Sequence, residues 1–125
     1  MPAVARIRER EPRMVWIETP SNPLLRITDI EAIAAAAREV GATVVADNTF
    51  LSPAGQQPFA LGADIVLHSA TKYIGGHGDT VAGLVCGPSE IMGHTRGEAL
   101  CDLGGSMSPF NAWLLLRGLK TLPVR

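Results

Sequence analysis

The sequence has few charged residues, and neither sign of charge dominates it. Asp, Glu, Lys and Arg make up 18% of the 125 residues, below the typical value of about 25%. Apolar residues reach 46% and the formal net charge is -1. Nucleic acids and anionic membranes select proteins with a strongly basic surface, so we expect neither as a partner. The composition is that of a globular protein with little surface charge.

The sequence also lacks long apolar runs and a cysteine framework. Residues 112–116 form one of its longest apolar runs, far below the roughly 20 residues of a membrane helix. The start, MPAVARIRER, has too short an apolar stretch for a signal peptide. We therefore expect a soluble, cytoplasmic protein. The two cysteines, Cys86 and Cys101, form no C-x-x-C pair. We expect them to be buried small side chains, with a reactive thiol as the alternative.

Metal and nucleotide motifs are missing as well. His68, His77, His94 and Asp79 share neither a helix face nor a known ligand spacing, so no metal site is predicted. The glycines at 75, 76 and 78 match neither G-x-G-x-x-G nor a phosphate loop ending in G-K-[ST]. The glycine run is instead expected to give the backbone freedom around its neighbouring lysine.

Short apolar runs separated by helical or turn-rich segments predict one α/β domain. Residues 14–18, 43–47 and 64–69 are β-prone and end in polar residues. This β-α-β alternation predicts a mostly parallel sheet, flanked by helices and covered on both faces. Residues 81–87 follow the glycine run too closely for a helical crossover. We therefore predict a fourth strand there, antiparallel or at the sheet edge.

Capping signals place the first predicted helix between two of these strands. Thr28 and Glu31 have the spacing of a capping box, so we expect the helix to begin at Thr28. Gly41 suits a left-handed C-cap, which predicts an end near Val40. A second helix is predicted at residues 88–100.

The last predicted helix follows Ser108. This residue is the expected N-cap, with Pro109 in the first helical position. Trp113, Leu116 and Leu119 recur at helical spacing and predict its apolar face. Trp16 and Trp113 are interpreted as core or interface residues.

Unusual polar residues follow each of the three parallel strands. In an open parallel sheet, ligands bind beyond the carboxyl ends of the strands. One site is therefore expected to collect residues that are distant in the sequence: Glu18 and Asn22 after the first strand, Asp47 and Asn48 after the second, and Ser69, Thr71 and Lys72 after the third.

The chemistry of these side chains suits pyridoxal phosphate (PLP). Partial desolvation of Lys72 favours the neutral amine that Schiff-base chemistry requires. Ser69 and Thr71 supply hydroxyl donors for a phosphate, and Asp47 supplies an acceptor for a protonated ring nitrogen. Taken alone, the spacing leaves an equal alternative, in which Asp47 is a turn former and Ser69 and Thr71 are polar loop residues. An arbitrary lysine is more often an exposed loop residue, and it is the neighbours of Lys72 that favour a site.

Four segments resemble one enzyme family. They are ETPSNP (18–23), VVADNTF (44–50), LGADIVLHSATKYIGGHGD (61–79) and SPFNAWLLLRGLKTLPVR (108–125). They resemble the Cys/Met-metabolism (trans-sulfuration) family of PLP-dependent enzymes, which includes cystathionine γ-synthase, the cystathionine lyases, methionine γ-lyase and the O-acylhomoserine sulfhydrylases. The resemblance runs from about Met14 to the C-terminus. It implies part of an aspartate aminotransferase-like (fold type I) large domain, and a homo-oligomer.

The resemblance also implies roles for individual residues. Lys72 forms the internal aldimine with PLP and, once freed, moves protons between Cα and Cβ of the substrate. Asp47 pairs with the pyridine nitrogen, and Ser69 and Thr71 contact the phosphate. The implied reaction is γ-elimination or γ-replacement on homoserine-ester, cystathionine or methionine-type substrates.

Three further positions follow from the same resemblance. Asn22 matches a position near the phenolic oxygen of the cofactor, and Glu18 matches an acid behind it. Ser106 falls in a stretch that lies near the amino-acid substrate in relatives.

Family members are much longer than this sequence. We therefore expect residues 1–13 to be an N-terminal extension or the start of a truncated region, and residues 14–125 to be a partial PLP-binding domain. Faces that pack against missing elements would lie open, which favours self-association. The alternative to an enzyme is thus a noncatalytic remnant that binds PLP weakly or only self-associates.

Overall fold

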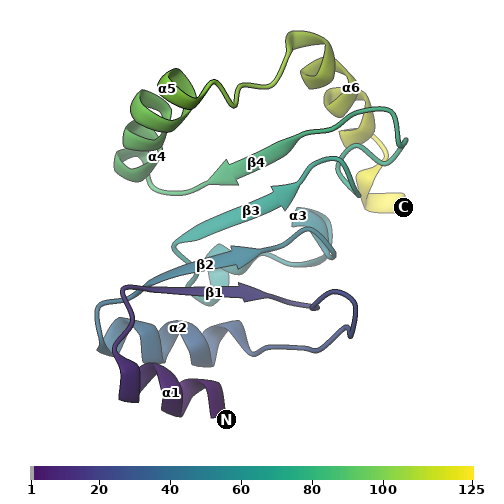
Figure 1. Ribbon diagram of the computed structural model, residues 1–125. Helices are drawn as coiled ribbons and strands as arrows, with labels where there is room; N and C mark the ends of the chain where they lie inside the picture. The colour runs from purple at the N-terminus through teal and green to yellow at the C-terminus, as the bar shows by residue number, and fades with distance from the viewer. Residues whose placement is uncertain (1) are drawn as a thin grey trace.

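Four strands form one sheet in the computed structural model, which describes residues 2–125 (Figure 1). Their order is β1 (Met14–Glu18), β2 (Thr43–Asp47), β3 (Ile65–Ser69) and β4 (Gly83–Cys86). The pairs β1–β2 and β2–β3 are parallel, and β4 is antiparallel to β3. The three predicted parallel strands and the antiparallel strand at the edge are confirmed.

Helical segments connect and follow the strands. They are α1 (Pro2–Arg10), α2 (Ile30–Glu39), α3 (Ser52–Gly55), η1 (Pro58–Leu61), α4 (Ser89–Thr95), η2 (Arg96–Leu100), α5 (Cys101–Leu103), α6 (Pro109–Leu119) and η3 (Leu122–Val124). The successive segments α4, η2 and α5 correspond to the helix predicted at residues 88–100. They begin one residue later than predicted and continue to Leu103.

The main core lies between α2 and the first two strands. Figure 1 shows α1 and α2 lying together beside β1 and β2. Ile33 of α2 and Val44 of β2 are 1% and 2% exposed, and Ile7 of α1 is buried in the same cluster. Arg8 of α1 also forms an exposed ion pair with Glu39 of α2. The nine residues of α1 therefore contribute to the packed fold.

The N-cap of α2 is Asp29, so the predicted start at Thr28 is wrong. The Asp29 side chain accepts a hydrogen bond from the backbone N–H of Ala32 at 3.0 Å. The backbone N–H of Thr28 instead donates to Oγ1 of Thr19 at 2.9 Å, which holds Thr28 in the preceding loop. The predicted end is confirmed, with Val40 as the C-cap.

Helix α6 begins as predicted but buries a different face. Ser108 is the N-cap and accepts from the backbone N–H of Asn111 at 3.2 Å. The buried residues of α6 are Leu114, Leu115 and Gly118, whereas Trp113, Leu116 and Leu119 are 59%, 61% and 42% exposed. The helix is apolar around most of its circumference, so apolar spacing does not identify the face that packs inward.

Both cysteines are exposed, and the expectation that they are buried is wrong. Cys86 ends β4 at the edge of the sheet, and Cys101 begins α5, which has no buried residue. Each lies on an element with little packing around it. For Cys86 the reason is that the part of the chain that the structure describes places no further strand beside β4.

One face of the sheet is largely uncovered. Side chains alternate between the two faces of a strand, and the strand register places Trp16, Val45 and Ile65 on the same face. Trp16 is 59% exposed and Met14, two residues earlier, is 54% exposed. We call this the open face. The expectation that helices cover both faces is wrong for residues 2–125. Trp16 is not in the core of this part of the chain, so of the two predicted positions, core or interface, only the interface stays a prediction. Within that range, no helix is long and apolar enough to span a bilayer.

Candidate active site

Three of the predicted site residues lie at the same end of the open face. Glu18 and Asp47 end β1 and β2 and are paired in register. Asp47 is also in register with Leu67, and Ser69 ends β3 two residues later. Because side chains two residues apart in a strand share a face, Glu18, Asp47 and Ser69 all belong to the open face. Their meeting at the carboxyl ends of parallel strands follows the sequence-based expectation.

Thr49 joins Asp47 to Ser69. Its hydroxyl donates to Oδ1 of Asp47 at 2.6 Å and accepts the backbone N–H of Ser69 at 2.8 Å. The backbone N–H of Thr49 donates to the same carboxylate oxygen at 3.0 Å. Two donors therefore fix the Asp47 carboxylate through one oxygen. Among residues 2–125, no donor is assigned to the other oxygen, Oδ2.

Thr49 was missed in the sequence, although it lies inside the VVADNTF segment. The available signal was the D-x-T spacing, in which an Asp side chain bonds to the backbone two residues later. That signal predicts a local turn. It does not reveal that the same hydroxyl reaches a neighbouring strand, because the contact with Ser69 spans twenty residues.

Asn48 holds the turn after β2 from inside the protein. It is 1% exposed. Its Nδ2 donates to the carbonyl oxygens of Ser52 and Gln56 at 3.1 and 2.9 Å, and its Oδ1 accepts from Nε2 of Gln56 at 2.9 Å. Gln56 Nε2 also donates to the carbonyl oxygen of Thr19, after β1. Asn48 is thus a satisfied buried amide that connects the ends of β1 and β2, not a ligand-facing group.

Lys72 lies in a tight turn immediately after β3. Its backbone N–H donates to the carbonyl oxygen of Ser69 at 3.1 Å, and its carbonyl accepts from Gly76 at 2.7 Å. The residue is exposed. Its side chain has no assigned ion pair or hydrogen bond among residues 2–125. The partial desolvation expected for Lys72 is therefore not present among residues 2–125, because the residue is exposed there.

Helix α6 packs directly against the backbone of the lysine loop. A Cβ at Gly118 would lie 2.3 Å from the carbonyl oxygen of Gly75 and 2.4 Å from that of Ile74. A Cβ at Gly75 would lie 2.9 Å from the carbonyl oxygen of Ala70. Gly118 thus allows helix and loop to approach closely, and Gly75 allows the loop itself to fold tightly against Ala70.

The Thr71 hydroxyl is already engaged with the protein. It donates to the carbonyl oxygen of Ala82 at 3.2 Å and accepts from the backbone N–H of Ala82 at 2.9 Å. A hydroxyl has one proton to donate. A contact between Thr71 and a phosphate therefore stays a prediction, and as a donated hydrogen bond it requires the hydroxyl to leave Ala82.

Glu18 and Asn22 lie together, whereas Ser106 lies elsewhere. Oε2 of Glu18 accepts the backbone N–H of Asn22 at 3.2 Å, and the Asn22 residue is exposed. Ser106 is exposed in the segment between α5 and α6, which Figure 1 shows beyond β4. Strands β3 and β4 separate it from β1 and β2. The structure does not bring Ser106 into the group formed by Glu18, Asp47 and Ser69.

His68 is a buried imidazole next to this group. It is 8% exposed, and its Nδ1 has no hydrogen-bond partner among residues 2–125. Burial lowers the pKa of His68, while the Asn48 backbone and the Asp47 carboxylate oppose the shift. The imidazole is therefore neutral near pH 7, and it follows from the alternation along β3 that it points away from the open face.

The chemistry of the side chains at the end of β2 and at the end of β3 and its following turn fits PLP. Asp47 has a carboxylate oxygen free for a ring N–H, Ser69 has a hydroxyl, and Lys72 has an amine without a protein partner. A hollow of about 420 Å³ lies beside the loop and is lined by Lys72, Tyr73, Gly76 and Arg125. Its lining does not include Asp47 or Ser69. The carboxylate and hydroxyl therefore lie on an open surface rather than in that hollow.

Comparisons with known proteins identify the family to which the chain is similar. The family model described as Cys/Met metabolism PLP-dependent enzyme matches residues 2–125. The chain is 44% identical to a canavanine γ-lyase of Rhizobium leguminosarum over its whole length, and 52% identical to the cystathionine γ-synthase of Escherichia coli over 92% of it. It covers 31% and 30% of those two relatives.

A solved structure gives the same result for the fold. The crystal structure of cystathionine γ-synthase from Xanthomonas oryzae, in complex with aminoacrylate and cysteine, matches 98% of the chain with a TM-score of 0.93 and 53% identity. The chain covers 32% of that protein. The chain thus spans about a third of the length of the relatives it matches, and the match includes α1, ahead of the point at which the sequence resemblance begins.

Proposed function

Because the chain belongs to the family of Cys/Met metabolism PLP-dependent enzymes, we propose that it is part of the cofactor-binding domain of a trans-sulfuration enzyme. The proposed reaction is γ-elimination or γ-replacement on homoserine-ester, cystathionine or methionine-type amino acids. Since the chain spans about a third of its relatives, the proposed activity belongs to an enzyme of their full length, which is expected to be a homo-oligomer.

The observation that carries this proposal is the anchoring of Asp47 by Thr49. One oxygen of the carboxylate is held by the Thr49 hydroxyl and backbone N–H, at 2.6 and 3.0 Å. The other oxygen is therefore oriented and available to accept a proton-bearing ring nitrogen. A carboxylate fixed in this way keeps such a nitrogen protonated. When bound, PLP supplies an electron sink that makes the Cα proton of an amino acid acidic.

Lys72 is the proposed attachment point and proton carrier. Its amine has no protein partner among residues 2–125, so it would be free to hold the cofactor through its aldehyde group, with release of water. A positioned amine within reach of the substrate then takes the proton from Cα and returns it at Cβ. The turn from Ser69 to Gly76 holds the backbone of Lys72 at the end of β3 for this purpose.

The remaining residues are proposed to orient the cofactor and substrate. Ser69 would hold the phosphate through its hydroxyl, and Thr71 would join it by giving up its bond to Ala82. Asn22 would lie near the phenolic oxygen, with Glu18 behind it, where its carboxylate accepts the Asn22 backbone N–H. Ser106 contacts the substrate only if the segment between α5 and α6 is covered by residues beyond this chain.

Absorption spectroscopy tests cofactor binding by the chain itself. Lys72 and Lys120 are its two lysines, which gives a matched control. With added PLP, the chain is expected to develop a visible absorption band distinct from that of free PLP. The Lys72→Ala variant loses this band and Lys120→Ala keeps it. If the unchanged chain develops no such band while folded, the noncatalytic alternative is favoured.

Substrate assays test the proposed reaction class. A full-length enzyme carrying this sequence is expected to convert at least one of O-acylhomoserine, cystathionine or methionine, with release or replacement of the γ-substituent. The Lys72→Ala variant serves as the inactive control. Absence of turnover with all three substrates by PLP-loaded enzyme contradicts the proposed reaction.

A further inference from the structure

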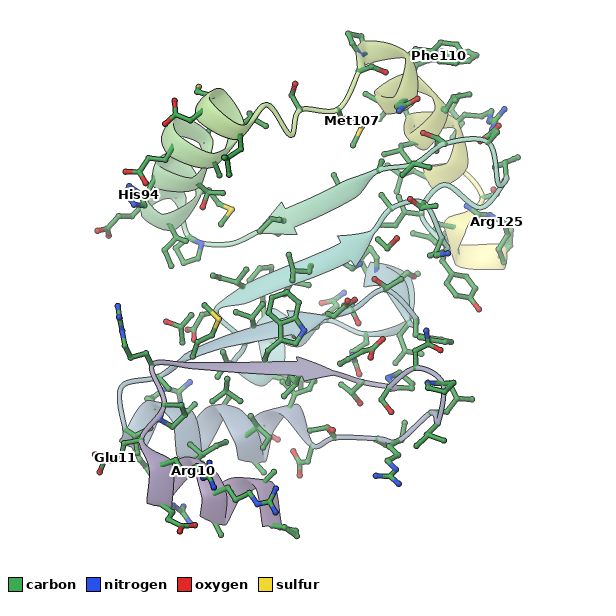
Figure 2. The ribbon with its side chains drawn as sticks, viewed as in Figure 1. Arg10, Glu11, His94, Met107, Phe110 and Arg125 are labelled. Carbon is green, nitrogen blue, oxygen red and sulfur yellow. The ribbon has the colours of Figure 1, made fainter. Side chains whose placement is uncertain are left out.

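Arg125 contacts the backbone of the loop that carries Lys72. Its Nη1 donates to the carbonyl oxygen of Tyr73 at 2.6 Å, and its Nη2 donates to the carbonyl oxygen of Gly118. Its Nε donates to Oγ1 of Thr121 at 3.0 Å. Figure 2 shows Arg125 at the end of the chain, beside the loop that follows β3. A single guanidinium thus connects this loop to the end of α6.

The guanidinium occupies space that the loop leaves at Gly76. A Cβ at Gly76 would lie 1.6 Å from Nη1 of Arg125, and the φ of this glycine is +69°. A larger residue would have to displace the arginine and also adopt a left-handed backbone. Gly76 therefore serves the turn and makes room for the side chain that bonds to Tyr73.

The contacts of Arg125 act on the backbone immediately after the lysine. Tyr73 follows Lys72 directly, and the Lys72 carbonyl accepts from Gly76 within the same turn. Gly118 of α6, whose own carbonyl accepts from Arg125, abuts the carbonyl oxygens of Ile74 and Gly75. The loop is thus packed against α6 at Gly118 and tied to it through Arg125.

We propose that Arg125 is a positioning residue for Lys72, because it fixes the backbone from which the amine extends. This inference rests on the proposed function, in which Lys72 binds the cofactor. A guanidinium presents its donors in a rigid planar fork, which a lysine amine does not reproduce. The two carbonyls therefore require arginine, and a positive charge alone is not sufficient.

Hydrogen exchange of the chain without cofactor tests directly whether Arg125 fixes the backbone of the lysine loop. In Arg125→Ala, the amides of residues 72–76 are expected to exchange about tenfold faster or more, since a hydrogen bond to a charged group is lost. Arg125→Lys is expected to behave like Arg125→Ala. The control Lys120→Ala removes a neighbouring positive charge and leaves exchange in the loop unchanged. If Arg125→Ala does not fold, as judged by circular dichroism, the exchange rates of the loop amides in Arg125→Lys decide whether the inference stands.

Reductive labelling separates this inference from the proposed function. After PLP is added and reduced with borohydride, the Arg125 variants are expected to carry less label on Lys72 than the unchanged chain, with any label on Lys120 as the internal reference. Unchanged exchange in the loop overturns the inference, and so does unchanged labelling of Lys72. If the unchanged chain takes no label on Lys72, the proposed function fails. Faster loop exchange in the Arg125 variants would then still show that Arg125 holds the backbone of the lysine loop.

Discussion

Among residues 2–125, Thr49 is the side chain that links the Asp47 carboxylate at the end of β2 to the Ser69 backbone at the end of β3. Replacing it with valine keeps the shape but removes both the donor to Asp47 and the acceptor of the Ser69 N–H. We expect Thr49→Val to lower the free energy of unfolding by about 1–3 kcal/mol, because a part-buried donor loses its partner. Urea denaturation measures this change.

Two further variants make the Thr49 prediction specific. Thr49→Ser keeps the hydroxyl and is expected to retain most of the stability. Thr43→Val is the control, at the first residue of β2. No side-chain hydrogen bond of Thr43 is assigned among residues 2–125, so little change in stability is expected. Equal losses in Thr49→Val and Thr43→Val would contradict the role of the Thr49 hydroxyl.

His68 gives the protein a pH-dependent stability. Burial lowers its pKa in the folded state below the ordinary value of 6.5. As pH falls below 6.5, the unfolded state binds a proton that the folded state does not, so stability decreases. The expected decrease is at most about 1.4 kcal/mol per pH unit until the folded-state pKa is reached. At pH 6.5 and above, this contribution is fully retained.

Urea midpoints between pH 7.5 and about pH 5 measure the effect of His68 before most carboxylates titrate. His68→Gln is expected to flatten the pH dependence in this range. His94→Gln is the control, because His94 is exposed beside Glu98. If the pH dependence of stability survives in His68→Gln and disappears in His94→Gln, it arises from His94, and the prediction for His68 is wrong.

Among the elements, α6 sets the position of the lysine loop through Gly118. A methyl group there would lie 2.3 Å from a backbone carbonyl oxygen, which does not yield as a flexible side chain does. We expect Gly118→Ala to destabilise the chain by about 1–3 kcal/mol, typical of overpacking. The urea midpoint provides the measurement.

Gly93→Ala is the matched helical control. No atom lies within 4 Å of a Cβ built at Gly93, and alanine favours helix over glycine by up to about 1 kcal/mol. This variant is expected to be neutral or stabilising. If Gly118→Ala behaves in the same way, α6 does not pack against the loop as described.

The elements also show what sequence patterns can and cannot predict. The strands were predictable because continuous apolar runs ending in polar residues are typical of buried parallel strands. The start of α2 was not, because Thr28 and Asp29 are both good caps and the bond from Thr28 to Thr19 decides between them. The face of α6 depends on which neighbours are present. The contacts of Thr49 with Ser69 and of Arg125 with Tyr73 join residues that are far apart in the sequence, so no local pattern predicts them.

At the scale of the whole molecule, the open face and α6 expose large apolar side chains. Met14 and Trp16 lie on the open face, and Phe110 stacks on Trp113 at an outer surface of α6. Strand β4 has no further neighbour among residues 2–125. Large apolar patches and unpaired strand edges promote association. We expect the isolated chain to self-associate.

Sedimentation velocity at several concentrations tests this expectation. The unchanged chain is expected to form species larger than a monomer, in proportions that increase with concentration. Trp16→Thr and Trp113→Lys should reduce association, because each removes apolar area while its position tolerates a polar residue. A strictly monomeric chain with a sharp two-state melt would show that these surfaces are tolerated in water.

We propose that Lys72 binds PLP covalently beside the Asp47 carboxylate. Borohydride reduction of the PLP-treated chain, followed by peptide mass spectrometry, is the sharpest test, because Lys72 and Lys120 are the two lysines. We expect a pyridoxyl group on Lys72, with less label in Asp47→Asn and none at this position in Lys72→Arg. Label on Lys120 in place of Lys72, or equal labelling of both, would show that Lys72 is not the attachment point.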